Sequence, residues 1–168
     1  MESFKPVIDE YYPILYKIGR SFTRTPADFE DLYQEMLIQV YKSLKNFRGQ
    51  SKTSTFIYKV ALNTAMTFNR NNKKKEQEVC TDDMTGLDHQ DDSGGSGQEK
   101  EQNVELLYDA INELCKDERA MILLHLEGKQ YDEIAAIMGI SKSNTGVKLM
   151  RIRKRLQTIL IRRGYERN

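Results

Sequence analysis

Lysine, arginine and asparagine side chains gather in one short segment near the C-terminal end of the sequence. Residues 142–155 have the sequence KSNTGVKLMRIRKR, which includes six Lys or Arg. Such cations neutralise DNA phosphates, and Arg and Asn also pair with the edges of guanine and adenine in the major groove. The segment could therefore bind duplex DNA; the alternative is a basic surface that faces only solvent.

A second group mixes basic, amide and aromatic side chains between residues 47 and 70. Its members are Phe47, Arg48, Lys52, Phe56, Tyr58, Lys59, Asn63, Phe68 and Arg70. Cations attract phosphate, and aromatic or amide groups can hold unstacked bases. This mixture favours binding of single-stranded nucleic acid. Alternatively, the cations at the end of this segment only complement the negative end of a helix dipole.

The residue types that enzymes use are sparse and scattered. The sequence has no His-Glu-x-x-His, no Cys-x-x-Cys, no glycine-rich phosphate loop and no nucleophile elbow. His89 and His125 stand alone, and Cys80 and Cys115 are too few for a disulfide scaffold. We therefore expect no enzymatic activity, no catalytic residue, no metal and no cofactor.

The composition indicates a chain that works in a reducing, cytoplasmic setting. No apolar run approaches the roughly 20 residues that a membrane span needs, and the N-terminus lacks the pattern of a secretory signal. A length of 168 residues allows one compact domain or two small ones.

Helices must position both groups of side chains. Residues 131–141 followed by residues 142–156 have the spacing of a helix-turn-helix, in which Gly139 makes the turn and Ser141 caps the second helix. A short helix over residues 104–114 and another opening at Asp117 precede it. The alternative to a DNA-binding unit is an ordinary helical hairpin.

The N-terminal part also has helical periodicity. Thr25 and Pro26 predict the start of a helix that runs to about Asn46, with one apolar stripe from Phe29 to Leu44. An earlier helix contains Pro13, which predicts a kink or a broken start, and a third spans residues 56–68. The opposite face of this second helix forms either a docking surface or a surface that faces only solvent. Its side chains are Asp31, Gln34, Glu35 and Ile38.

Charge divides the chain into three parts. Residues 1–75 have a net charge of +6, residues 76–105 of −9 and residues 106–168 of +4. Residues 76–103 are poor in apolar side chains and rich in Asp, Gly and Ser, so we expect a flexible linker with a span of about 30 Å. The predicted fold is all-α, with helical domains at 1–75 and 104–168 on either side of that linker.

Two stretches of the chain resemble one known family. Residues 31–35 (DLYQE), 47–49 (FRG) and 55–65 (TFIYKVALNTA) look like the promoter-melting domain of extracytoplasmic-function sigma factors. Residues 131–141 and 147–156 resemble their C-terminal promoter-binding domain. The sequence departs from the family at Phe56, where Trp is common, at Leu62, where Arg is common, and at Gly146 and Val147, which interrupt a more usual polar pattern.

The resemblance implies a protein that binds core RNA polymerase and directs it to promoters. Its docking face for polymerase would be Asp31, Gln34, Glu35 and Ile38. The melted minus-ten element would be held by Phe47, Arg48, Lys59, Asn63 and Arg70. The minus-thirty-five element would be bound as duplex by Lys142, Ser143, Asn144, Lys148 and Arg151.

The same resemblance implies two further features. The acidic linker would pass through a basic polymerase channel as a nucleic-acid mimic, or would be a simple tether. An anti-sigma factor is expected as a partner. The rival class is a stand-alone helix-turn-helix regulator, which would leave the N-terminal domain unexplained.

Overall fold

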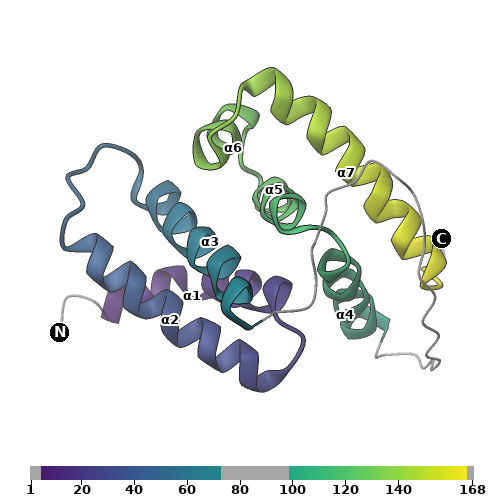
Figure 1. Ribbon diagram of the computed structural model, residues 1–168, viewed down its shortest axis with the longest axis horizontal. Helices are drawn as coiled ribbons and strands as arrows, with labels where there is room; N and C mark the ends of the chain where they lie inside the picture. Colours follow the sequence, from purple (N-terminus) through teal and green to yellow (C-terminus); the bar gives the residue numbers. More distant parts are fainter. Residues whose placement is uncertain (1–4, 73–98, 166–168) are drawn as a thin grey trace.

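The computed structural model describes residues 5–72 and 99–165, and all regular structure in these ranges is α-helical (Figure 1). The helices are α1 (Lys5–Phe22), α2 (Pro26–Leu44), α3 (Thr53–Asn72), α4 (Glu99–Asn112), α5 (Lys116–Leu126), α6 (Tyr131–Met138) and α7 (Lys142–Arg162). The all-α prediction is therefore confirmed. Residues 76–98 of the expected linker, including Cys80 and His89, lie outside the described residues. Its last five residues, 99–103, were wrongly predicted as linker, because they belong to α4.

Helices α1, α2 and α3 pack against one another and bury one shared core. The apolar stripe of α2 supplies Leu32, Met36 and Val40, each at most 3% exposed. Thr25 caps this helix as predicted, because its side chain accepts a hydrogen bond from the Asp28 N–H at 3.1 Å. Pro13 lies inside α1 without dividing it, so the expected broken start is absent from this helix.

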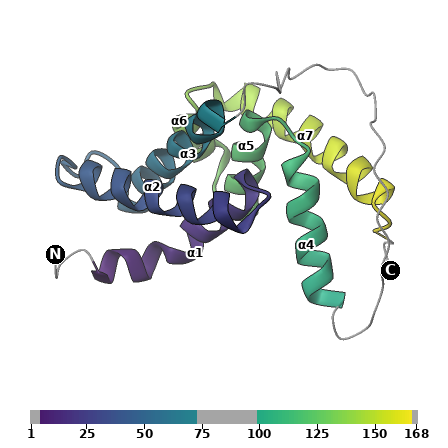
Figure 2. The same ribbon diagram turned by 60° about the horizontal axis from the view of Figure 1, so that its bottom comes forward.

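Helices α4 to α7 form the second group, in which α5 and α6 lie between α7 and the first three helices (Figures 1 and 2). Helix α4 begins at Glu99, five residues before the start that the periodicity from Val104 predicts. The pattern does not reveal this first part of the helix, because residues 99–103 are polar and carry no apolar stripe. Buried side chains of α5, including Met121 and Leu124, fill the centre of this group.

Cys115 stands at the start of α5, as the residue before its first turn. It is 8% exposed, and its N–H donates a hydrogen bond to the Glu118 carboxylate at 3.3 Å. Its sulfur is not a free thiol. Cys115 therefore contributes to the packing and capping of α5 and offers no reactive group at the surface.

The two helical groups touch along α1 and α3 on one side and α4, α5 and α6 on the other (Figure 2). Glu127 joins them, since its carboxylate accepts from Lys17 Nζ at 2.5 Å and from the Tyr58 hydroxyl at 3.2 Å. Asn112 adds a bond from its side-chain amide to the Arg20 carbonyl at 3.2 Å. The interface therefore contains directed polar bonds between residues that are far apart in the sequence.

Candidate nucleic-acid interface and docking face

The helix-turn-helix predicted from the sequence forms around a tight turn. Gly139 ends α6 with φ of 70°, a left-handed conformation that glycine adopts without strain. Ser141 then caps α7, because its hydroxyl accepts from the Asn144 N–H at 3.2 Å. Thr145 is fully buried, and its hydroxyl donates to the Ser141 carbonyl at 3.0 Å. A polar residue thus occupies a core position without an unpaired group.

The buried stripe of α7 determines which of its side chains face outward. Thr145, Leu149, Ile152, Leu156 and Ile159 are buried, and α7 packs against α4, α5 and α6. The candidates for duplex binding all lie off this stripe and are exposed. They are Lys142, Ser143, Asn144, Lys148 and Arg151. The structure therefore brings them together on the first three turns of one helix.

Three arginines further along α7 and at its end pair with acidic side chains within the protein. Arg155 bonds Glu118 at 2.7 Å, with both side chains less than one third exposed. Arg162 and Arg163 pair with Glu113, and Arg163 also lies 3.7 Å from Asp109. These arginines attach α7 to α4 and α5, so the basic surface available for phosphates is shorter than the basic sequence.

Two apolar side chains, Val147 and Met150, lie on the outward face of α7, and their exposure was not predicted from the sequence. Val147 is 46% exposed and Met150 is 53% exposed. The sequence alone could not separate them from Leu149 and Ile152, since all four stand within one stretch of the helix. Gly146 lies beside Val147, and a side-chain carbon added there would stand 3.5 Å from the Tyr131 ring, an ordinary contact.

The candidates for single-stranded binding lie on α3 and on the loop before it. Phe47 packs on Phe56 with ring centroids 4.5 Å apart, which fixes the loop against the start of α3. Lys59 and Asn63 are exposed one turn apart on α3, and Arg48 is exposed in the loop. Arg70 belongs to the last turn of α3, and its side chain lies outside the described part.

Tyr58 faces away from this surface. Its side chain is 4% exposed and its hydroxyl bonds Glu127 of the second group. Burial, together with the Glu127 charge and this hydrogen bond, raises the pKa of Tyr58 well above its ordinary value. Lys129 Nζ stands 5.0 Å from the centre of the same ring. In this arrangement Tyr58 is an interface residue, unlike the neighbouring Lys59.

The acidic face of α2 is continuous. Asp31, Gln34 and Ile38 are exposed at one helical face and Glu35 is half-buried beside them. Ile38 is 46% exposed although it is apolar, and Glu35 Oε1 accepts from Gln39 Nε2 at 2.7 Å. A single exposed apolar side chain is common on protein surfaces, so Ile38 by itself does not separate a docking surface from a solvated face.

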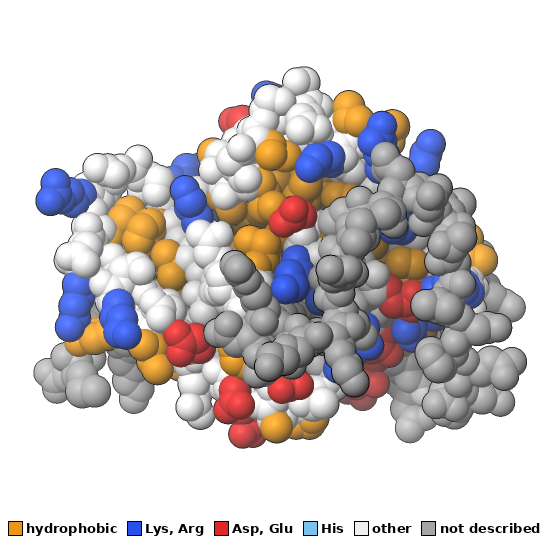
Figure 3. Space-filling model, in the orientation of Figure 1, with side chains coloured by type: hydrophobic (Ala, Val, Ile, Leu, Met, Phe, Trp, Pro, Cys, Tyr) orange, Lys and Arg blue, Asp and Glu red, His pale blue; other side chains and the backbone are white. Residues whose placement is uncertain are grey.

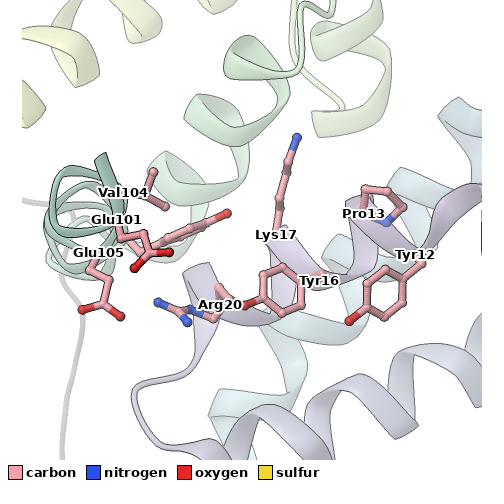
Figure 4. A pocket seen from close by; sticks show the side chains of 9 residues that line it. Tyr12, Pro13, Tyr16, Lys17, Arg20, Glu101, Val104 and Glu105 are labelled. Carbon is pink, nitrogen blue, oxygen red and sulfur yellow. The ribbon is translucent and has the colours of Figure 1, made fainter. Parts of the chain in front are cut away.

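A groove of about 600 Å³ lies between α1 and α4. Figure 4 shows that both helices contribute its walls. The lining residues are Tyr12, Pro13, Tyr16, Lys17, Arg20, Glu101, Val104, Glu105 and Tyr108. Tyr12 and Val104 are about half exposed, so the groove offers apolar surface to a partner.

Family models match the chain in two places. Sigma-70 region 2 matches residues 7–75, and Sigma-70 region 4 matches residues 104–156. The chain is 28% identical over 138 residues to the ECF RNA polymerase sigma-E factor of Haemophilus influenzae, covering 77% of this chain and 73% of that protein. It is 29% identical over 138 residues to the protein of the same name from Escherichia coli K12, covering 76% and 71%.

Solved structures share the fold. The sigma factor RpoE in complex with the anti-sigma factor NepR, from Bartonella quintana, superposes with a TM-score of 0.69 at 22% identity and covers 96% of this chain and 98% of that one. CnrH in complex with the cytosolic domain of CnrY gives a TM-score of 0.65 at 16% identity, covering 96% and 89%. In the ranges that the structure describes, no helix is both long and apolar enough to cross a membrane.

Proposed function

The chain belongs to the extracytoplasmic-function family of sigma factors, and from this premise we propose that it binds core RNA polymerase and directs it to specific promoters. The observation that carries the proposal is the order of the two family matches, a region 2 followed by a region 4, each with an exposed polar face. We propose no catalytic step and no cofactor for the chain itself.

Recognition of the minus-thirty-five element is assigned to α7. A helix-turn-helix inserts the N-terminal part of its second helix into the major groove, and the first turns of α7 carry the exposed candidates. Asn144 and Arg151 suit adenine and guanine edges, whereas Lys142 and Lys148 suit phosphates. Ser143, whose hydroxyl lies 3.3 Å from that of Ser141, can bond either.

Holding of the melted minus-ten element is assigned to α3 and its preceding loop. Extruding a base costs a few kcal/mol of stacking and pairing, which a fixed pocket must offset. The Phe47–Phe56 contact supports the loop that carries Arg48, and the exposed Lys59 and Asn63 follow it on α3. Arg70 would add a phosphate contact at the end of the same helix.

Docking to polymerase is assigned to the face formed by Asp31, Gln34, Glu35 and Ile38. Its acids suit a basic partner surface, and Ile38 supplies apolar area that a bound partner would cover. No basic side chain is bonded to Asp31 or Glu35 in the described residues, which supports a role outside the molecule.

An anti-sigma factor is a proposed second partner. One solved neighbour is a sigma factor in complex with an anti-sigma factor, and the other is in complex with the cytosolic domain of a second protein. The groove between α1 and α4 offers this chain a concave surface for such a partner. The site of action would be the cytoplasm, where polymerase and DNA are found. The acidic segment before α4 would pass through a basic polymerase channel or would be a tether.

In vitro transcription tests the proposal. Core polymerase and a pool of genomic promoter fragments should yield specific transcripts only when the purified chain is added. A pull-down with core polymerase separates this function from that of a stand-alone helix-turn-helix regulator, which would bind DNA but not polymerase. Absence of both transcripts and polymerase binding would refute the proposed function.

A further inference from the structure

Val147 and Met150 form an apolar pair in the middle of an otherwise polar surface. They are 46% and 53% exposed, and they stand three residues apart, so their side chains are neighbours on one face of α7. In Figure 3, hydrophobic and basic side chains lie next to one another over α7. Packing among the described residues therefore leaves about half of each side chain uncovered.

The position of the pair on α7 indicates what it faces. The buried stripe runs through Thr145, Leu149 and Ile152, and a step of about 100° per residue places Val147 on the opposite side of the helix. Val147 also lies in the second turn after the Ser141 cap, between Ser143 and Arg151. It is therefore at the centre of the surface that the proposed function directs into the major groove.

The major groove presents one apolar group to a bound helix, the 5-methyl group of thymine. An exposed Val between hydrogen-bonding neighbours can bury that methyl group while Asn144 or Arg151 bonds an adjacent base edge. A flat protein partner fits less well, because the apolar pair is surrounded on the same face by Lys148, Arg151 and Lys154. A thymine in duplex DNA thus matches both features, because its methyl group suits the apolar pair and the DNA phosphates suit the surrounding basic side chains.

We propose that Val147 and Met150 select thymine in the minus-thirty-five element by contact with its 5-methyl group. The inference rests on the function proposed above and adds two specificity-determining residues to it. Such a contact acts differently from the phosphate contacts of the lysines, since it discriminates between bases and does not depend on salt.

Deoxyuridine provides the probe, because it differs from thymidine only by the missing methyl group. Holoenzyme made with the unaltered chain would first select duplexes from a pool with a randomised upstream element. Each thymine of the selected element would then be replaced by deoxyuridine, one at a time, and the Kd of the holoenzyme would be measured. At one or two positions the replacement should weaken binding about fourfold, as expected for one buried methyl group.

Variants connect that loss to the two side chains. In Val147→Ala or Met150→Ala, the penalty for deoxyuridine at the corresponding position should disappear. Ile161→Ala is the matched control: Ile161 is 61% exposed on the same helix, about 21 Å further along its axis, and its removal should leave every penalty unchanged. All three positions are exposed, so the fold should tolerate the changes.

Three outcomes overturn the inference. If no deoxyuridine penalty changes in Val147→Ala or Met150→Ala, the pair makes no thymine contact. If those variants weaken binding to core polymerase and leave the penalties intact, the pair is a protein contact. Both results leave the proposed function standing. If holoenzyme selects no duplex at all, the inference and the proposed function fail together.

Discussion

The two helical groups both carry basic residues but use them differently. In the C-terminal group, Arg155, Arg162 and Arg163 bond to acids of α4 and α5 and their connecting loop, and the proposed phosphate contacts, Lys142 and Lys148, lie earlier on α7. In the N-terminal group, Lys17 bonds across to Glu127, whereas Arg48 and Lys59 are exposed. The two groups therefore differ in what their ion pairs join: the pairs of α7 lie within its own group, whereas Lys17 pairs across the junction.

A basic residue in such a protein therefore has one of two uses. Half-buried pairs such as Arg155–Glu118 fix one helix against another, and exposed cations remain for phosphates. Variants can test this division, beginning with the surface on which we expect charge to matter most.

Reversal of charge on the α2 face should have the largest effect. Asp31→Lys combined with Glu35→Lys should weaken core polymerase binding by about a hundredfold or more, because opposed like charges at an interface cost several kcal/mol. Binding would be measured by fluorescence anisotropy, and circular dichroism should show an unchanged helical content. Asp9→Lys, which reverses an exposed acid on α1 away from this face, is the control and should bind nearly normally. Unchanged binding of the double variant would remove this face from the docking surface.

Loss of one base contact in the C-terminal group should come next. Asn144→Ala should weaken promoter binding about 5- to 100-fold, since a paired hydrogen bond to a base edge is worth about 1–3 kcal/mol. Gln157→Ala removes an equally exposed amide from the same helix beyond the proposed contact region and should have little effect. Equal losses for the two variants would contradict the position of the duplex surface.

A smaller and more selective effect is expected in the N-terminal group. Asn63→Ala should reduce the permanganate reactivity of thymines in the open promoter several-fold while duplex binding persists, because an extruded base loses one of its hydrogen-bonding partners. Duplex affinity measured on the same complexes is the internal control. Normal reactivity would exclude Asn63 from the melting surface.

The smallest effect is expected when a single cation of α7 is removed, and it allows an exposed cation to be compared with a paired one. Lys148→Ala should reduce the slope of log K against log salt for promoter binding by about one, as expected for one lost phosphate contact. Arg162→Ala should leave the slope unchanged, because Arg162 is bonded to Glu113 within the protein. Equal changes in slope would show that ion pairing in the free chain does not predict the DNA surface.

Local pattern was sufficient to predict most of the helices. The Thr25 cap, the stripe of α2 and the Gly139 turn each depend on residues within a few positions of one another, so the sequence contains the whole interaction. The start of α4 at Glu99 was missed, because its first turn is polar and has no apolar stripe.

Interactions between distant residues could not be predicted in the same way. Nothing in the sequence pairs Lys17 or Tyr58 with Glu127, so Tyr58 was grouped with the nucleic-acid candidates although it faces the second group. Val147 stood out in the sequence only as a departure from the family's usual polar pattern, and the burial of Thr145 and Leu149 was needed to show that Val147 and Met150 face outward.

Glu127 has a consequence for any state in which the two helical groups part. Glu127 bonds Lys17 through one carboxylate oxygen and Tyr58 through the other, so both bonds are lost whenever the two groups separate. Separation of the two groups would leave the Lys17 ammonium and the Tyr58 hydroxyl without this carboxylate, and it would expose the Tyr58 ring on a face of α3 that points away from Lys59 and Asn63.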